Sequence, residues 1–284
     1  MTKIDIEARG KINLTLDVLF KRPDGYHEVE MIMQNIALKD IIALELISTR
    51  NIRIKTDCPE LPCDKNNLVY QAAKLMMDEF QLDAGICITL NKNIPLAAGL
   101  AGGSADAAAV IVGINELFDL KRSQEELMTL GKRIGADVPF CIFGKTALAR
   151  GIGEQITPLK PLSGFGVLLI KPPYSVSTKQ VYNRLNVKNI KQRPDTKSMV
   201  EHIRRQNMGD IASKLCNVLE EVTFKLYPQL ITIKNCLIQK GALGSLMSGS
   251  GPTVFGLFES VLDAKRAAGA ILDKGNRVFI TEMK

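Results

Sequence analysis

The segment from residue 86 to residue 118 constrains the fold of this 284-residue chain more than any other part of the sequence. Ile86, Ile88 and Leu90 alternate with other residues and predict a short strand, and a loop of small residues follows. An alanine-rich helix is expected to begin near Ser104 and to end at about Phe118. The segment therefore predicts a strand, a glycine-rich loop and a helix start, in that order.

The loop within this segment, residues 95–104, has the composition of an anion-binding site. Three glycines occur within five residues, at positions 99, 102 and 103. Glycine lets the backbone approach a phosphate closely, and the amides of a helix N-terminus add positive potential. Ser104 and Asp106 add a hydroxyl and a carboxylate that could meet Mg²⁺. A flexible loop before a packed helix is the alternative, but the glycine spacing favours anion binding.

Other nucleotide-binding motifs are missing from the sequence. Gly144-Lys145-Thr146 resembles the end of a P-loop, but Pro139 stands where the first glycine of that motif is required. No G-x-G-x-x-G pattern follows the early strands, which argues against a dinucleotide-binding fold. The G-x-S-x-G pattern of a hydrolase nucleophile is absent as well.

Three further features are candidates on weaker grounds. A second glycine loop at residues 247–253, with Gly249, Ser250 and Gly251, lies between two predicted strands. A tight hairpin is an equally good interpretation of it, although in a two-domain protein it would be able to close over the first loop and cover the phosphates. Asp137 follows a predicted helix and Lys11 lies between strand segments. Such residues are most often capping or solvated residues.

The pattern along the chain predicts an α+β protein of two domains, 1–160 and 161–284, divided near a change of composition at residues 158–164. Alternating apolar residues around the turn at 22–25 predict a hairpin over 12–37, and Ser123 with Glu126 forms a capping box. The first half is further expected to contain strands at 41–47 and 51–55 and helices at 66–80 and from 123 to about 135. The second half is expected to contain strands at 166–170, 243–247, 252–258 and 277–282 and helices at 177–185, 195–206, 209–222, 228–240 and 260–273.

The charge balance narrows the class of partner. The 37 Lys and Arg against 30 Asp and Glu give a net charge of +7, which favours anionic partners. The basic residues are scattered, aromatic residues make up only 5% and Trp is absent. A stacking surface for nucleic acid is therefore not expected, and small phosphorylated ligands are favoured.

The cysteines and the N-terminus predict a cytoplasmic protein. The first residues have no apolar signal region, and the six cysteines are best interpreted as reduced thiols. The histidines, His27 and His202, do not combine with the cysteines in the spacing of a structural zinc site. No apolar run approaches the roughly 18 residues that a membrane span needs.

Four blocks of sequence resemble the GHMP kinases, a family named for galactokinase, homoserine kinase, mevalonate kinase and phosphomevalonate kinase. They are residues 95–109, residues 247–253, Lys11-Ile12-Asn13-Leu14 and Arg22-Pro23-Asp24-Gly25-Tyr26-His27-Glu28. Supporting stretches at 134–141 and 176–182 extend the similarity over nearly the whole chain. The block at 22–28 resembles members that act on a cytidine diphosphate conjugate. One departure is Arg9-Gly10, where family members usually have Pro-Ala; it would hold Lys11 less firmly and could cost some activity.

The resemblance implies a fold and a reaction. It implies an N-terminal domain like the second domain of ribosomal protein S5, a ferredoxin-like α/β sandwich as the C-terminal domain, and a site between them. The implied enzyme is a small-molecule kinase that uses ATP and Mg²⁺ to phosphorylate an alcohol. Asp137 would accept the hydroxyl proton, Lys11 would orient Asp137 in its ionised form, and Ser104 would be the metal ligand. The residues implied in ATP binding are Asn67, Pro95, Leu96, Ala97, Ala98, Gly99, Leu100, Ala101, Gly102, Gly103, Ser104, Ala105 and Asp106.

The resemblance also implies substrate contacts. Tyr26 and His27 would form part of a cytosine pocket, Tyr182 would add an aromatic face, and Asn13 would contact the polyol part of the substrate. The implied partners are ATP and a cytidine diphosphate conjugate, with no nucleic acid and no membrane, for a monomer or weak homodimer. The alternatives are another GHMP small-molecule kinase, of homoserine or mevalonate type, or a non-catalytic nucleotide- or RNA-binding protein. The presence of Lys11 and Asp137 argues against the non-catalytic alternative.

Overall fold

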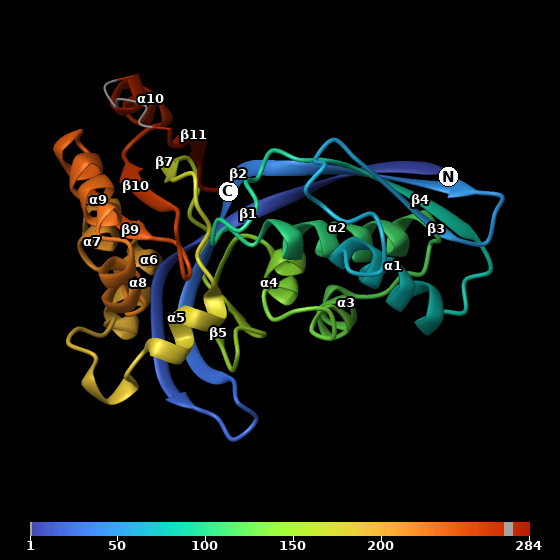
Figure 1. Ribbon diagram of the computed structural model, residues 1–284, viewed down its shortest axis with the longest axis horizontal. Coiled ribbons are helices and arrows are strands. Elements are labelled where there is room, and N and C mark those ends of the chain that lie inside the picture. Colours follow the sequence, from blue (N-terminus) through green and yellow to red (C-terminus); the bar gives the residue numbers. More distant parts are fainter. Residues whose placement is uncertain (1, 270–274) are drawn as a thin grey trace. The chain divides into compact units, whose positions relative to one another are not determined.

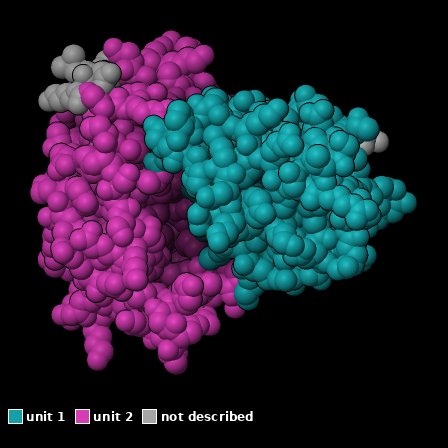
Figure 2. All heavy atoms as spheres, turned by 45° about the vertical axis from the view of Figure 1, so that its right-hand side comes forward, with its two compact units in different colours: residues 1–10, 39–96, 101–144 teal, residues 11–38, 97–100, 145–284 magenta. Residues whose placement is uncertain are grey.

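The computed structural model of the protein describes residues 2–269 and 275–284, and these residues form two compact units. Unit 1 comprises the described residues of 1–10, 39–96 and 101–144, and unit 2 comprises 11–38, 97–100 and the described residues of 145–284 (Figure 2). Neither unit is continuous in sequence, because two long strands pass through both. Among the described residues, no helix has the length and apolarity needed to cross a membrane.

These two strands, β1 (Lys3–Lys21) and β2 (His27–Ile47), are neighbours in a sheet and are joined by a short turn (Figure 1). In the turn, Asp24 Oδ1 accepts a hydrogen bond from the Tyr26 amide at 3.0 Å, and Gly25 has φ +88°. The predicted hairpin over 12–37 is confirmed and is longer at both ends. The strand predicted at 41–47 is present, but it is the last part of β2 and not a separate strand, because β2 runs without a break through Lys39 and Asp40.

In unit 1, the last part of β2 pairs antiparallel with β4 (Gly85–Asn91), which pairs parallel with β3 (Ile52–Thr56). The helices are α1 (Leu68–Glu79), α2 (Gly102–Leu117), α3 (Gln124–Gly131) and α4 (Val138–Phe143). Small buried alanines of α2 let it pack closely against α1, and both helices contribute to the core of this unit. The helix predicted to end near residue 135 ends at Gly131, and α4 was not predicted as a helix.

In unit 2, the first part of β2 pairs antiparallel with β5 (Thr146–Arg150), and β5 pairs with β6 (Gln155–Pro158). β5 and β6 are not predicted from the sequence, because they are short and do not show a clear alternation. The last part of β1 pairs parallel with the two-residue strand β8 (Cys216–Asn217).

A second sheet in unit 2 has the strand order β11-β7-β10-β9, with every neighbouring pair antiparallel. Its strands are β7 (Gly166–Lys171), β9 (Gly244–Met247), β10 (Val254–Phe258) and β11 (Arg277–Glu282). Helix α9 packs against β9 and β10, and α10 packs against β7 and β11. The four strands lie where the sequence predicts them, and the α+β class is confirmed.

The helices of unit 2 are α5 (Thr178–Arg184), α6 (Thr196–Arg205), α7 (Met208–Ser213), α8 (Glu220–Leu226), α9 (Gln229–Gln239) and α10 (Val261–Gly269), with a short 3₁₀ turn at Val187–Asn189. The single helix predicted over 209–222 is wrong. Its middle becomes β8, which takes its backbone partners from Thr15 and Leu16 of β1. The predicted helix at 260–273 corresponds to α10, and its last four positions lie outside the described residues.

Candidate active site

The glycine-rich loop ends in a helix start that no side chain caps. Ala101 is the N-cap residue of α2; its backbone is left-handed, with φ +56°, and no side chain accepts a hydrogen bond from the first turn. Gly103 in that turn is exposed, and Ser104 is half-buried. The first amides of the 16-residue helix α2 therefore suit an anion such as a phosphate. The helix begins two residues before the predicted start at Ser104.

A buried ion triad supports this helix start within unit 1. The Lys92 ammonium pairs with both Asp40 and Asp106, and all three side chains are at most 5% exposed. Asp40 also accepts the amide hydrogens of Asn93 and Ile94, so it holds the chain that enters the loop. Burial raises the pKa of Asp106 to about 7, and the Lys92 charge opposes that rise. Lys92 and Asp40 are not predictable as site residues from the sequence, because a lone lysine or aspartate is usually solvated.

Of the two groups proposed from sequence to meet Mg²⁺, Ser104 is the more accessible. Asp106 is 2% exposed and is engaged with Lys92, while its Oδ1 atom is buried without a hydrogen-bond partner. Among the described residues, no group of three or more His, Cys, Asp and Glu side chains could hold a metal ion. A divalent cation at this loop would therefore take most of its oxygen ligands from phosphate and water.

Lys11 and Asn13 form a buried pair in unit 2. The Lys11 side chain donates from Nζ to Asn13 Oδ1 at 2.8 Å and to the Gly99 carbonyl at 3.3 Å. Lys11 is 4% exposed and Asn13 is fully buried. The Lys11 amide also donates to the Leu100 carbonyl at 3.0 Å. Lys11 is thus in direct contact with the glycine-rich loop, and Asn13 is bonded to Lys11.

The second glycine loop contacts the same place. Ser248 Oγ donates to the Gly99 carbonyl at 2.9 Å, and the Gly249 amide donates to Asn13 Oδ1 at 3.1 Å. The loop is a tight hairpin between β9 and β10, closed by the Ser248 amide bonding to the Thr253 carbonyl. A Cβ atom at Gly99, where φ is +76°, would lie 2.2 Å from the Ser248 carbonyl oxygen. Only glycine allows this approach of the two loops.

Two of the residues predicted to form a cytosine pocket, His27 and Tyr182, lie next to each other. The rings of His27 and Tyr182 lie with their centroids 5.2 Å apart and their planes tilted by 42°. His27 is 9% exposed, whereas Tyr26 is 60% exposed. Burial lowers the pKa of His27, and the positive charge of Lys21 lowers it further, so the neutral imidazole is favoured. A neutral imidazole can both donate and accept hydrogen bonds at a base edge.

Asn67 and Asp137 each precede a helix in unit 1. The Asn67 side chain caps α1: Oδ1 accepts from the Val69 amide at 3.1 Å, and Nδ2 donates to the Pro62 carbonyl at 2.7 Å. Its amide group is therefore committed to local structure. Asp137 is half-buried at the start of α4, but its side chain makes no capping bond there. The position of Asp137 in the sequence suggests a capping role, but its side chain does not cap α4.

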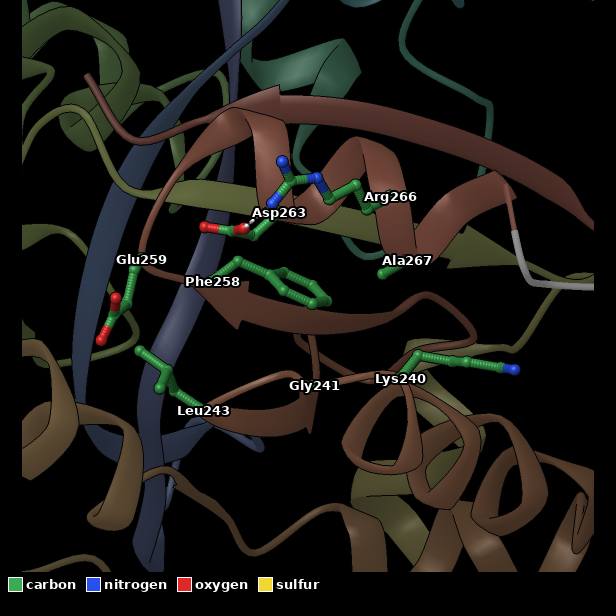
Figure 3. Close-up of a pocket in the computed structure, with 8 residues that line it drawn as sticks. All are labelled: Lys240, Gly241, Leu243, Phe258, Glu259, Asp263, Arg266 and Ala267. Atoms are coloured by element: carbon green, nitrogen blue, oxygen red, sulfur yellow. Dashed lines mark hydrogen bonds and ion pairs between the residues drawn. The ribbon is translucent and has the colours of Figure 1, made fainter.

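A pocket of about 410 Å³ lies elsewhere in unit 2, between the segment after α9, the end of β10 and α10 (Figure 3). The guanidinium of Arg266 faces the carboxylate of Asp263 there, at 3.4 Å. None of the residues lining this pocket was predicted as a site residue; they are Lys240, Gly241, Leu243, Phe258, Glu259, Asp263, Arg266 and Ala267. The lining contains two cationic residues, Lys240 and Arg266, and two anionic ones, Glu259 and Asp263, so the pocket lacks the excess positive charge that favours a phosphorylated ligand.

Comparison with known proteins identifies relatives along the whole chain. Residues 67–145 match the model for the GHMP kinases N terminal domain, and residues 199–277 match the model for the GHMP kinases C terminal domain. A protein of Acetivibrio thermocellus named 4-diphosphocytidyl-2-C-methyl-D-erythritol kinase is 48% identical over 282 residues, which cover 99% of each chain. A protein of Lachnospira eligens with the same name is 49% identical, again over 99% of each chain.

Solved structures agree with these matches. A crystal structure described as 4-(cytidine 5'-diphospho)-2C-methyl-D-erythritol kinase superposes with a TM-score of 0.84 at 32% identity, covering 99% of both chains. Homoserine kinase from Cytophaga hutchinsonii superposes with a TM-score of 0.78 at 22% identity, covering 99% of this chain and 95% of that one. The second likeness supports the fold alone.

Proposed function

Because the chain belongs to the GHMP kinase family and is an ATP-dependent small-molecule kinase, we propose that its substrate is 4-diphosphocytidyl-2-C-methyl-D-erythritol. The reaction is transfer of the γ-phosphoryl group of ATP to the 2-hydroxyl of the methylerythritol part, a step in the non-mevalonate route to isoprenoid precursors. The observation that carries this proposal is the near-complete coverage of relatives that bear this name, at 48% and 49% identity.

The glycine-rich loop is the proposed site of the ATP phosphates. Its uncapped helix start offers amides to phosphate oxygens, and the Lys92 triad keeps that helix start in place. Mg²⁺, with Ser104 as a proposed ligand, would neutralise charge on the phosphates when bound. Asn67 would border the nucleotide through its packing, because its amide group is already used in capping α1.

Asp137 and Lys11 are the proposed groups for the chemical step. Phosphoryl transfer depends mainly on positioning and on charge stabilisation, and an alcohol nucleophile also needs an acceptor for its proton. Asp137 supplies the acceptor carboxylate. Lys11 supplies a positive charge whose place is set by Asn13 and the Gly99 carbonyl. Loss of the Asp137 carboxylate should therefore affect turnover much more than nucleotide binding.

Recognition of the cytidyl group is assigned to the hairpin turn and α5. His27 is buried in a form that can hydrogen-bond a base edge, and Tyr182 provides a ring close to it. Tyr26 exposes most of its side chain beside them. Asn13 is the proposed contact to the polyol part. Each assignment predicts a larger effect on the KM of the cytidyl substrate than on the KM of ATP.

A substrate panel tests the proposal. The purified protein is incubated with ATP and Mg²⁺ and with the cytidyl substrate, homoserine or mevalonate, and ADP release is followed. Turnover of the cytidyl substrate alone is expected. Turnover of homoserine or mevalonate, with none of the cytidyl substrate, would replace the proposal by another GHMP kinase activity. In the same assay, Asp137→Asn should lower kcat by about 100-fold or more while ATP binding is kept, and an unchanged kcat would remove Asp137 from the mechanism.

A further inference from the structure

One buried side chain at the end of β8, that of Asn217, is hydrogen-bonded to the backbone of the second glycine loop. Its Nδ2 atom donates to the carbonyl oxygens of Met247 and Gly249, each at 2.8 Å. Its Oδ1 atom accepts from the Leu219 amide at 3.0 Å. Asn217 is 4% exposed, so these bonds are shielded from water. Both hydrogens of Nδ2 are thus used to fix the backbone of a loop thirty residues away in sequence.

Gly249 links Asn217 to the strand β1 through two hydrogen bonds. Its carbonyl accepts from Asn217, and its amide donates to Asn13 Oδ1 at 3.1 Å. The same Asn13 oxygen accepts from Lys11 Nζ at 2.8 Å. Both Asn13 and Gly249 are buried. A continuous set of hydrogen bonds therefore runs from Asn217 through Gly249 and Asn13 to the ammonium of Lys11, entirely within unit 2.

We propose that Asn217 is a positioning residue for the kinase reaction, which sets the place of Lys11 through Gly249 and Asn13. The inference rests on the proposed function of Lys11. It requires an amide at position 217, because the side chain donates to two carbonyl oxygens and also accepts from the Leu219 amide. An aspartate there would face the same carbonyls with acceptor oxygens and would push the loop away.

Glu220 makes a second contact with the start of this loop. Its Oε1 atom accepts from the Met247 amide at 2.8 Å, so Glu220 bonds the N–H of Met247 and Asn217 bonds its C=O. Glu220 is in turn paired with Lys234 of α9. Glu220 therefore contacts only the start of the loop, at Met247, whereas Asn217 contacts both Met247 and Gly249.

The competing interpretation is that Asn217 only stabilises the fold, through its bond to the Leu219 amide. That role needs the acceptor oxygen alone, and Asn217→Asp keeps it. Asn207 offers a matched control in the same unit: it is exposed, and its Oδ1 accepts from the Asp210 amide at 3.2 Å as the N-cap of α7. Asn207→Asp keeps that cap and touches neither glycine loop.

The first experiment measures kcat and both KM values of Asn217→Asp and Asn217→Ser against wild type and Asn207→Asp, with the acceptor that wild type turns over in the substrate panel. A displaced Lys11 should lower kcat about 10- to 100-fold, with the KM of ATP changed by less than about threefold. Asn217→Ser, which can donate one hydrogen bond, should lie between wild type and Asn217→Asp. An unchanged kcat in Asn217→Asp, or an equal loss in Asn207→Asp, overturns the proposal.

A second measurement needs no substrate, so it separates failure of this proposal from failure of the proposed function. Lysines are acetylated under native conditions, and peptides are followed by mass spectrometry. Lys11 should react about tenfold faster in Asn217→Asp than in wild type, because its acceptor is displaced. Lys171 is a buried reference in the same unit, 8% exposed and bonded to the Tyr174 carbonyl. Equal acceleration of Lys11 and Lys171, or acceleration of neither, would mean that Asn217 has only a structural role.

Discussion

Replacing Lys92 by methionine removes the only cation of the buried triad while keeping an aliphatic chain of similar size. Two carboxylates then share a site without it: the side chain of Asp40 is fully buried and that of Asp106 is 3% exposed. Asp40 retains the amide hydrogens of Asn93 and Ile94. Asp106 loses its bond from Lys92, and its other oxygen already has no hydrogen-bond partner. Removing one partner of a buried ion pair costs about 3–5 kcal/mol of the free energy of unfolding.

The pH dependence distinguishes lost charge pairing from a packing defect. Burial raises the pKa of Asp106 from 3.8 to about 7 in the folded protein. The folded state therefore binds a proton that the unfolded chain has released, and stability falls as the pH rises between these two values. Without Lys92 the pKa of Asp106 rises further. The difference in unfolding free energy between wild type and variant should then grow by about 1.4 kcal/mol for each pH unit above 7.

Urea denaturation followed by circular dichroism, at about pH 6 and about pH 8, measures both effects. Lys92→Met should lose about 3–5 kcal/mol at the higher pH and at least about 1 kcal/mol less at the lower pH. Lys74→Met is the control, because Lys74 pairs with Asp78 on the surface of α1, and it should change stability by no more than about 0.5 kcal/mol. A loss below about 1 kcal/mol in Lys92→Met, or the same loss at both pH values, would refute the reasoning.

Two further substitutions test other parts of the candidate site. Gly99→Ala should lower the free energy of unfolding by more than about 2 kcal/mol, because its Cβ would collide with the Ser248 carbonyl. Gly25→Ala is the control: its φ is also positive but no atom lies near its Cβ, so it should lose only about 1 kcal/mol. Equal losses in urea denaturation would contradict the close approach of the loops. Tyr182→Ala removes the ring beside His27, so in steady-state assays it should raise the KM of the cytidyl substrate about tenfold and leave the KM of ATP unchanged. Equal rises in both KM values would count against a cytosine pocket.

Local patterns predicted much of the fold. The capping box at Ser123 is present with both of its bonds, since the Ser123 hydroxyl accepts from the Glu126 amide and the Glu126 carboxylate accepts from the Ser123 amide. This signal depends on residues three apart and needs no tertiary contact. The strand β7 of the second sheet is predicted for a similar reason, because the apolar run at 166–170 is followed closely by Pro172 and Pro173.

The errors arose where distant partners decide the structure. Residues 209–222 have enough helix-forming residues to predict one helix, but Cys216 and Asn217 pair with β1 instead, two hundred residues earlier in the chain. β2 continues through Asp40 because Lys92 and two backbone amides satisfy that carboxylate. Neither partner can be read from the local pattern around these residues.

In the candidate site as well, local patterns were predicted from the sequence and contacts between distant residues were not. The glycine loops and Lys11 were found from composition and from the family resemblance, and the structure brings Gly99, Ser248 and Lys11 into contact. Asn217 was missed, although a polar residue between Cys216 and Val218 in a mostly apolar stretch was a usable signal. Its partners at 247 and 249 become visible only once the chain is folded.

The hydrogen bond between Asn13 and Gly249 joins residues 236 positions apart, and this has a consequence for biosynthesis. During translation, β1 is made first, and its buried polar side chains must wait for a loop that is made almost last. A ribosome adding about 5–20 residues per second takes roughly 10–50 s to cover that interval. The Lys11 and Asn13 side chains can bond to each other as soon as β1 is made, whereas the bond from the Gly249 amide to Asn13 has to wait for residue 249. The hydrogen bonds around this part of β1 are therefore completed only near the end of synthesis.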